Sequence, residues 1–258
     1  MRSNIIRLPR LEPGDDFPSL DLAWGSDSQA SGLLAAGGQL DVSTICRAYG
    51  NGIFPWYSEN QPILWWSPDP RMTLNVSKFK LHRSLKQAIQ NFRQSPNCDI
   101  RVDTSFEAVI TACATSPRNG QFTGPNTTWI GPDMIDAYQA MHRSGFAHSV
   151  EVWIDGQLAG GLYCVALGKA VFGESMFSRV PNASKIALAA LVSFCRAHDI
   201  ESIDCQQNTR HLASLGAVEV PRAEFIHQLH NALAKPAPHW QFKSLYWQEL
   251  SQPNNLAT

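Results

Sequence analysis

The sequence has few charged residues and no excess of either sign. Charged side chains make up 17% of its 258 residues, and the formal net charge at pH 7 is -1. A protein that binds nucleic acid over its whole surface carries a strong positive field, so any such contact here must be a local patch. The N-terminus lacks the apolar core of a secretion signal, and no apolar run approaches membrane-spanning length. We therefore expect a cytoplasmic protein that binds neither membrane nor DNA.

The six cysteines and eight histidines lack the spacing of redox or ligand motifs. No two cysteines follow the C-x-x-C pattern, and no H-E-x-x-H sequence is present. Most of the cysteines stand among apolar residues, which is typical of reduced core cysteines in a cytosolic protein. We therefore predict no metal site and no cofactor.

Residues 1–70 are predicted to form a small N-terminal domain. Residues 1–30 are rich in Pro, Gly, Asp and Ser, which favours an extended arm on the surface. Glycines punctuate residues 31–40 and predict a turn. Asp41 can then cap a short helix that runs to Ala48.

The most aromatic part of the chain lies at residues 54–71. Its prolines rule out a long helix, so rigid loops must present the tryptophans. Trp65 and Trp66 can equally well be core residues. Trp56 follows Pro55 and precedes a polar stretch, which makes it the better candidate for a platform on which a base stacks.

Residues 71–258 are predicted to form a larger second domain. A possible capping box, Thr104 with Glu107, precedes an amphipathic helix. Residues 116–128 are rich in Gly, Pro, Asn and Thr and predict a mobile loop. Further helices are expected at 82–93, 132–144, 183–197, 210–215 and 222–234, and strands at 149–154, 158–167, 170–173 and 201–206.

In its second half the chain runs hairpin, strand, helix, strand, helix. This order is the skeleton of the acetyltransferase superfamily, so the predicted fold class is α+β, with a GNAT-like mixed sheet after the small N-terminal domain. The loop that cradles the pyrophosphate of acyl-CoA in that superfamily, [RQ]-x-x-G-x-[GA], is missing, and SRVPNASK stands in its place. The order of elements favours acyl transfer, and the missing loop argues for a donor other than acyl-CoA.

The segment from Ala170 to Lys185 combines a strand end, an acid and the start of a helix. Glu174 follows the strand among apolar residues, where a carboxylate is costly unless it meets donors or a cation. Asn182 is a good N-cap for the apolar helix that follows. The alternative is that Glu174 has no function and is a partly exposed loop acid paired with Arg179 or Lys185. The sequence GESMF resembles a nucleophile elbow, but Phe177 stands where the closing glycine relieves the strained turn, which argues against a Ser175 hydrolase.

Two other clusters are candidates for function. Asp204 and Gln206 end a predicted strand, and period-two alternation places them on one face; alternatively, they only hydrogen-bond neighbouring loops. Arg83 and Lys86, with Lys78 and Lys80 before them, make a basic cluster. A solvated helix face explains this cluster as well as phosphate contact does.

Seven segments together resemble the leucyl/phenylalanyl-tRNA–protein transferases. The matches appear in family order and cover about residues 32–222. The segments are GIFPWYS (52–58), ILWWSPDPR (63–71), TWI (128–130), HSVEVW (148–153), FGESMFS (172–178), NASK (182–185) and DCQ (204–206).

The resemblance implies an enzyme that moves Leu, Phe or, less well, Met from aminoacyl-tRNA onto proteins that begin with Arg or Lys. The product is marked for degradation by the N-end rule. Because the aminoacyl ester is already activated, neither ATP nor a metal is required. The implied architecture is a small N-terminal domain before an acetyltransferase-like one.

The resemblance also implies roles for particular residues on the donor side. Trp56 and Trp129 match positions associated with the aminoacyl-adenosine end of the donor. Arg83 and Lys86 match the helix that contacts tRNA. The apolar pocket of the family corresponds to Leu162, Val171, Leu188, Leu191 and Ile203.

For the reaction itself, we expect three polar residues to act. Asp204, oriented with Gln206, binds the α-amine and accepts or relays its proton. Gln206 can also donate to the developing oxyanion. Glu174 neutralises the basic side chain or the amine of the acceptor.

Three other functions compete with this one. A small-molecule N-acyltransferase would use acyl-CoA, against which the missing pyrophosphate loop speaks. A non-catalytic RNA-binding module would use Trp56, Trp129 and Arg83. An aminoacyl-tRNA-dependent cell-wall transferase would share the donor and differ in the acceptor.

Overall fold

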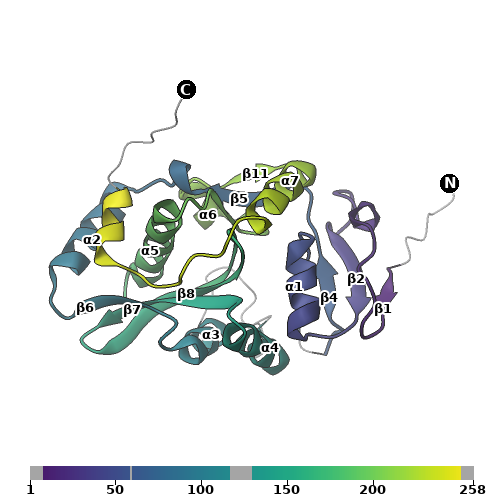
Figure 1. Ribbon diagram of the computed structural model, residues 1–258, viewed down its shortest axis with the longest axis horizontal. Coiled ribbons are helices and arrows are strands. Elements are labelled where there is room, and N and C mark those ends of the chain that lie inside the picture. Colours follow the sequence, from purple (N-terminus) through teal and green to yellow (C-terminus); the bar gives the residue numbers. More distant parts are fainter. Residues whose placement is uncertain (1–7, 59, 117–129, 251–258) are drawn as a thin grey trace.

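The computed structural model describes residues 8–58, 60–116 and 130–250, which form two β-sheets with helices around them (Figure 1). The predicted mobile loop at 116–128 lies, apart from residue 116, outside the described residues, as does Trp129. Helices and sheets together confirm the predicted α+β class.

The smaller sheet is built by the N-terminal part of the chain. Its strand order is β1-β2-β4-β3, in which β1 pairs with β2 in parallel and the other pairs are antiparallel. Helix α1, Val42–Gly50, packs against it through Ala48. The strands are β1 Arg10–Leu11, β2 Leu33–Gly37, β3 Phe54–Pro55 and β4 Leu64–Trp66.

The turn predicted at residues 31–40 is wrong, because strand β2 occupies its centre. The glycines stand at the ends of the apolar stretch, and the stretch itself pairs with the strand that carries Trp65 and Trp66. The predicted cap of α1 is confirmed: the Asp41 carboxylate accepts a hydrogen bond from the Thr44 amide at 3.0 Å.

The larger sheet has seven strands in the order β11-β5-β10-β9-β8-β7-β6. Strands β9 and β10 are parallel and are joined through helix α5, whereas the other pairs are antiparallel. The predicted succession of hairpin, helix and returning strand is thereby confirmed. The strands are β5 Arg71–Asn75, β6 Cys98–Val102, β7 Ala147–Ile154, β8 Gln157–Leu167, β9 Ala170–Ser178, β10 Ser202–Asp204 and β11 Val218–Val220.

Helices cover both faces of the larger sheet (Figure 1). On one face lie α2 Arg83–Gln94, α5 Ala183–Ala197 and the 3-10 helix η3 Ser244–Leu250. On the other face lie α3 Phe106–Thr115, α4 Pro132–Arg143, α7 Arg222–Leu233 and α1. The remaining short elements are η1 Leu20–Leu22, η2 Val76–Lys78 and α6 Arg210–Ser214.

Helix α5 has the predicted bounds and is buried nearly all round, as its apolar sequence indicates. Asn182 occupies the N-cap position, but its backbone is left-handed (φ 68°) and its side chain makes no capping hydrogen bond. The side-chain cap is therefore not formed. The helix starts close to β8. A Cβ added to Gly160 on β8 would lie only 2.5 Å from the Cβ of Ala183, the first residue of the helix.

Strand β9 is longer than predicted, so Glu174 lies inside a strand and not in a loop. The pairing of β9 with β8 shifts register at this point: Tyr163 pairs with Ser175, whereas Cys164 pairs with Gly173. Glu174 is the extra residue of this β-bulge. Bulges re-aim a side chain while keeping the strand paired on both sides.

The capping box predicted at Thr104 is wrong, although the helix is confirmed as α3. Glu151 on β7 is fully buried, and a buried carboxylate requires hydrogen-bond donors. It accepts from the hydroxyl and amide of Thr104 and from the amide of Ser105. The Thr104 amide that a capping box would offer to Glu107 is thus bound by Glu151, and the N-cap position falls on Ser105.

Candidate functional site

The site is built around the carboxylate of Glu174. The hydroxyl of Tyr49, on α1, donates to its Oε1 at 2.7 Å, and that of Tyr138, on α4, donates to its Oε2 at 3.3 Å. The two hydroxyls also contact each other at 2.5 Å. The amide Nε2 of Gln206 donates to Oε1 at 3.3 Å. Groups from the N-terminal part of the chain (Tyr49) and from its C-terminal part (Tyr138 and Gln206) therefore converge on one carboxylate.

Burial sets the charge state of this cluster. Desolvation raises the pKa of Glu174 from 4.5 to about 8, although hydrogen bonds from Tyr49 and Tyr138 act in the opposite direction. Burial and the neighbouring Glu174 raise the pKa values of both tyrosines well above 10. The tyrosines are therefore neutral donors near pH 7, whereas Glu174 exchanges its proton in a range useful for catalysis.

Asp204 meets a different partner, because it forms a buried ion pair with Arg71. The Nε and Nη2 atoms of Arg71 donate to the two carboxylate oxygens at 2.8 and 2.7 Å. The two side chains are 0% and 2% exposed. Such a two-pronged pair is geometrically specific, and it fixes the carboxylate in one orientation.

The surroundings of Arg71 come from several elements. Its Nη1 donates to the carbonyl of Gly52 at 3.1 Å, and its guanidinium lies 4.8 Å from the ring of Phe54 and 4.7 Å from that of Phe225. These contacts leave the guanidinium enclosed by aromatic rings. The ion pair joins β5 to β10, and the contacts of Arg71 with Gly52 and Phe54 link this pair to the N-terminal part of the chain.

Gln206 lies beyond the end of its strand, which is shorter than predicted. Strand β10 ends at Asp204, so alternation along a strand does not place these two residues on one face. Instead, Gln206 has a left-handed backbone (φ 55°), and its amide N–H donates to Oδ1 of Asp204 at 3.0 Å. This turn sends the side chain to Glu174, so Asp204 reaches Glu174 through Gln206.

The residues predicted for the apolar pocket lie together in the core on the α5 face of the larger sheet. Each of them is at most 4% exposed. They come from β8, β9, α5 and β10, and they are Leu162, Val171, Leu188, Leu191 and Ile203. Val171 and Asp204 also border a surface cavity of about 430 Å³ between the sheet and α7.

The tryptophans divide between core and surface. Trp65 and Trp66 are buried, and the indole N–H of Trp66 donates to the carbonyl of Trp56 at 2.6 Å. Trp56 itself is partly buried, with its ring 5.3 Å from that of Trp66 in an edge-to-face contact. Trp56 is therefore less buried than its two neighbours in the motif.

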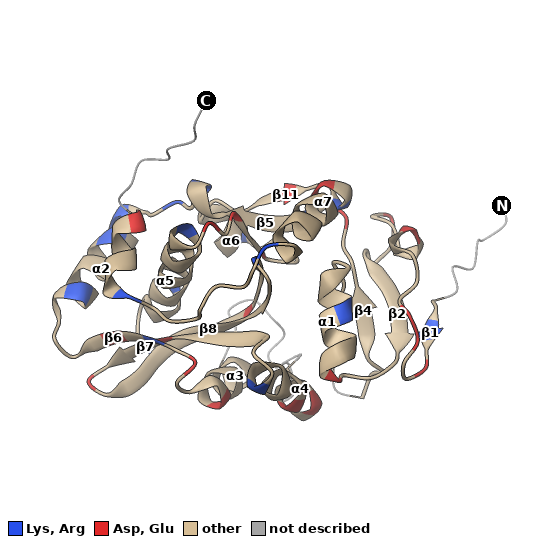
Figure 2. Ribbon diagram, viewed as in Figure 1, with Lys and Arg blue, Asp and Glu red and all other residues tan. Residues whose placement is uncertain are grey.

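Arg83 and Lys86 are exposed on the first turns of α2, and Figure 2 shows Lys and Arg along this helix. Lys78 and Lys80 precede them and are also exposed. Within the residues that the structure describes, neither Arg83 nor Lys86 forms a salt bridge. The cluster is therefore positive at the surface.

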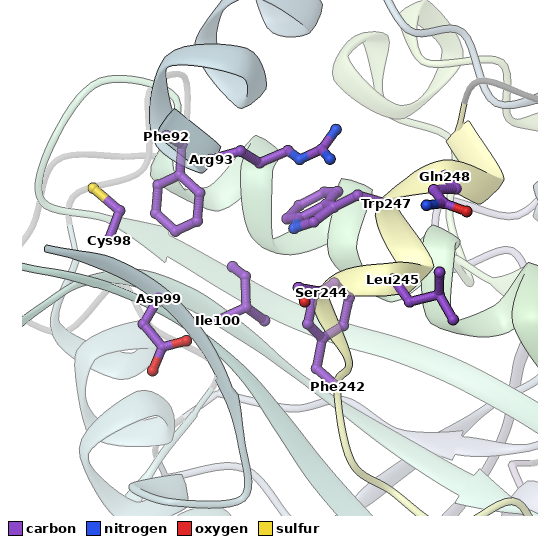
Figure 3. Close-up of a pocket in the computed structure, with 10 residues that line it drawn as sticks. All are labelled: Phe92, Arg93, Cys98, Asp99, Ile100, Phe242, Ser244, Leu245, Trp247 and Gln248. Carbon is purple, nitrogen blue, oxygen red and sulfur yellow. The ribbon is translucent and has the colours of Figure 1, made fainter. Parts of the chain in front are cut away.

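A surface cavity of about 640 Å³ lies apart from these groups, between α2, β6 and η3 (Figure 3). Phe92, Ile100 and Trp247 give it apolar walls, and Arg93 and Asp99 add charges. None of the predicted site residues that the structure describes borders it. In the described part of the chain, no group of three or more His, Cys, Asp or Glu side chains is placed to hold a metal ion. The same residues include no helix with the length and apolar character to cross a bilayer.

Two family models match the chain, one after the other. The model of the N-terminal domain of leucyl/phenylalanyl-tRNA protein transferase matches residues 38–69. The model of leucyl/phenylalanyl-tRNA protein transferase matches residues 73–230. The chain belongs to the leucyl/phenylalanyl-tRNA–protein transferase family. The N-terminal model covers Tyr49, and the second covers Glu174 and Asp204.

Relatives in this family are similar over the whole chain. The leucyl/phenylalanyl-tRNA–protein transferase of Albidiferax ferrireducens is 60% identical over 258 residues, which is 100% of both chains. That of a Polaromonas species is 58% identical over 243 residues, 94% of each chain. A solved GCN5-related N-acetyltransferase-like protein from Streptococcus suis is 12% identical, with a TM-score of 0.32, over 69% of this chain and 63% of its own.

Three residues of this candidate site were missed by reasoning from the sequence. Arg71 stood in one of the family motifs without a role, and Tyr49 and Tyr138 were not singled out. A tyrosine on a buried helix face needs a partner for its hydroxyl, which was the available signal. The partner lies more than 30 residues away in each case, so the sequence alone did not reveal it.

Proposed function

We propose that this chain transfers Leu, Phe and, less well, Met from aminoacyl-tRNA to the α-amine of proteins that begin with Arg or Lys, which marks those proteins for degradation. The observation that carries the proposal is family membership along the whole chain at up to 60% identity. The partly buried, uncompensated acid at Glu174 supports a cationic acceptor.

The chemistry is aminolysis of an ester. The acceptor's neutral α-amine forms a bond to the aminoacyl carbonyl carbon, and the bond from that carbon to the ribose oxygen breaks. The amine loses a proton and the ribose oxygen gains one. An α-amino group has a pKa of about 7.7–8, so a useful fraction is neutral near pH 7. Correct positioning of the two reactants can then supply roughly 7–11 kcal/mol of the acceleration.

On the acceptor side, we assign Glu174 to the positive charge of the incoming chain end. Its carboxylate has no cationic partner among the described residues, whereas that of Asp204 is already paired with Arg71. Gln206 bridges the two acids, which supports a role as hydrogen-bond donor to the oxyanion. The ion pair favours a positioning role for Asp204 over proton acceptance.

On the donor side, Trp56 and Trp129 hold the adenosine end, and Leu162, Val171, Leu188, Leu191 and Ile203 surround the aminoacyl side chain. The partial exposure of Trp56 supports the first role. The shared location of the five apolar residues supports the second. One methylene in such a pocket is worth about 1–3 kcal/mol, so Leu, Phe and Met should react to differing extents.

Arg83 and Lys86 are proposed to contact phosphates of the tRNA. Their exposure on α2, without salt-bridge partners in the described residues, supports this assignment. Because tRNA is the donor, we place the protein in the cytoplasm. We also propose a domain division between residues 1–70 and 71–258, which separates the last strand of the smaller sheet from the first of the larger one.

The proposal is tested by incubating the purified protein with radiolabelled Leu-tRNA and peptides that start with Arg, Lys or Ala. Label should move to the first two peptides only. Transfer to a muropeptide instead, thiol release from acetyl-CoA, or equal affinity for charged and uncharged tRNA without transfer would each support one of the competing functions and contradict this one.

A further inference from the structure

The hydroxyls of two tyrosines, one from the N-terminal and one from the C-terminal part of the chain, contact the carboxylate of Glu174. Tyr49 lies on α1, in the N-terminal part, and Tyr138 lies on α4, in the C-terminal part. Both residues are fully buried, and their hydroxyls contact each other as well as the two oxygens of Glu174. Both carboxylate oxygens therefore lie against neutral hydroxyl groups, whose two protons are shared among these three contacts.

The two acids of the site differ in what holds them. Asp204 has both oxygens bound by the guanidinium of Arg71, so a proton added there would break a buried ion pair. Glu174 sits at the β-bulge of β9, is partly exposed, and contacts only uncharged groups by hydrogen bonds among the described residues. Of these two acids, Glu174 can take up a proton without losing a cation.

We propose that Tyr49 and Tyr138 hold Glu174 as the group that accepts the proton of the attacking amine, so that the N-terminal part of the chain supplies a positioning residue to the reaction. This inference rests on the proposed function and assigns its proton acceptor. Glu174 touches the reacting nitrogen in this scheme, whereas the tyrosines act through Glu174.

The proton balance is simple. The acceptor's α-amine attacks as the neutral group and forms its bond to the carbonyl carbon, while the Glu174 carboxylate takes up the proton that this nitrogen loses. The ester bond breaks, the ribose oxygen takes up that proton from Glu174, and the carboxylate is restored. An acid with a pKa of about 8 is partly ionised in the pH range where an amine with a pKa of about 7.7–8 is partly neutral, so both reacting forms are present together.

The charged and titratable groups around Glu174 act in both directions. Burial raises its pKa most strongly, and the charge of Asp204 on β10 raises it further. The hydroxyls of Tyr49 and Tyr138 and the charge of Arg71 on β5 lower it. Removing a tyrosine hydroxyl should therefore raise the pKa of Glu174 and leave less carboxylate at neutral pH.

The test compares Tyr49→Phe and Tyr138→Phe with the wild type in single-turnover transfer from Leu-tRNA to an Arg-initiated peptide. The ratio of variant rate to wild-type rate is measured from about pH 6.5 to about pH 9, because the ratio cancels titration of the amine and hydrolysis of the ester. If one lost hydroxyl raises the pKa of Glu174 by about one unit, the ratio is about 0.1 near pH 7 and rises to about one half near pH 9.

Tyr246→Phe is the matched control, because that tyrosine lies on η3 and contacts His198. Its rate ratio should stay near 1 at every pH. A ratio for Tyr49→Phe and Tyr138→Phe that is reduced but independent of pH, or not reduced at all, would overturn the proposal, since a loss of packing does not depend on the ionisation of Glu174.

Glu174→Gln separates proton acceptance from binding of the acceptor. Loss of a proton acceptor typically costs about 10²–10⁴ in rate, and saturating peptide should not restore it. Recovery of full kcat at high peptide concentration would show that Glu174 only binds the acceptor, and would end the proposal.

A measurement without substrate distinguishes failure of this inference from failure of the proposed function. The pKa of Glu174 can be followed by NMR in protein labelled with ¹³C-glutamate, with Glu174→Gln identifying the signal. The pKa should rise in both tyrosine variants relative to the wild type. If the wild type transfers nothing, the proposed function fails; if transfer occurs but the pKa does not move in the variants, only the present inference fails.

Discussion

Glu174 and Asp204 lie on neighbouring parallel strands, yet their carboxylates have opposite electrostatic surroundings. Asp204 is paired with a guanidinium, whereas Glu174 is desolvated and bound by hydroxyl and amide donors. When two acids of one site meet such different partners, their chemical roles differ too. One acid fixes structure, and the other is free to change its protonation.

The raised pKa of Glu174 predicts a pH-dependent stability. The folded protein binds this proton more tightly than the unfolded chain does, because burial raises the pKa from 4.5 to about 8. The stability contributed by the proton is complete below the unfolded pKa and is lost as the pH rises through about 8. The melting temperature of the wild type should therefore fall relative to that of Glu174→Gln between about pH 5 and about pH 8.5.

Differential scanning calorimetry at several pH values measures this difference. Glu219→Gln, at an exposed position of β11, is the matched control and should follow the wild type at every pH. A gap between wild type and Glu174→Gln that stays constant with pH would show that Glu174 has an ordinary pKa in the folded protein.

At the scale of elements, the site depends on how closely β8, β9 and α5 approach one another. Strands β8 and β9 pair along most of their length, and the bulge at Glu174 interrupts that pairing once. Helix α5 then begins against β8 at Gly160, where the space for a side chain is missing. The end of β9 that follows Glu174 is thus held by pairing with β8 and lies close to the start of α5.

Gly160→Ala is predicted to destabilise the protein. Its new Cβ would lie 2.5 Å from that of Ala183 and 3.1 Å from the carbonyl oxygen of Phe177, so the start of α5 or strand β9 must move. Overpacking of this kind typically costs about 1–3 kcal/mol. Urea denaturation should show a lower midpoint with an unchanged slope.

Gly173→Ala serves as the control on the neighbouring strand. There the nearest atoms to a new Cβ are 3.5 and 3.6 Å away, which is ordinary contact, and no positive φ is involved. Its midpoint should stay close to that of the wild type. Equal losses in the two variants would mean that close approach at Gly160 is not what holds α5 in place.

At the scale of the whole molecule, a nearly neutral protein must bind a highly charged tRNA through part of its surface. The exposed cations of α2 offer such a part (Figure 2). Contacts to phosphates release counterions, so log affinity falls linearly with log salt concentration. The slope of that line is proportional to the number of phosphate contacts.

Arg83→Ala and Lys86→Ala are each predicted to weaken tRNA binding and to reduce the slope of log affinity against log salt by about 1. The slope is measured by filter binding or fluorescence anisotropy over a range of salt concentrations. Lys235→Ala is the control, since that lysine is paired with Glu201 and follows α7. An unchanged slope in both α2 variants would assign these residues to an ordinary solvated helix face.

Local patterns were sufficient for most helices. The apolar period and the flanking residues predicted α2, α4, α5 and α7 to within two residues, because a buried helix face must repeat every three to four positions. The pattern failed at β2, where glycines at both ends of a short strand imitate a turn, and at Thr104, whose donors are used by the buried Glu151.

The sequence by itself determined that this chain has an α+β fold, a buried central helix, and a set of motifs specific to one transferase family, because these depend on residue order within short segments. It also singled out Glu174, Asp204 and Gln206. Only the tertiary structure decided what each one meets: Arg71 for Asp204, and Tyr49 with Tyr138 for Glu174. The charge state of each acid follows from those partners and from burial. The sequence does not reveal either one, because the residues that meet in the site are far apart along the chain.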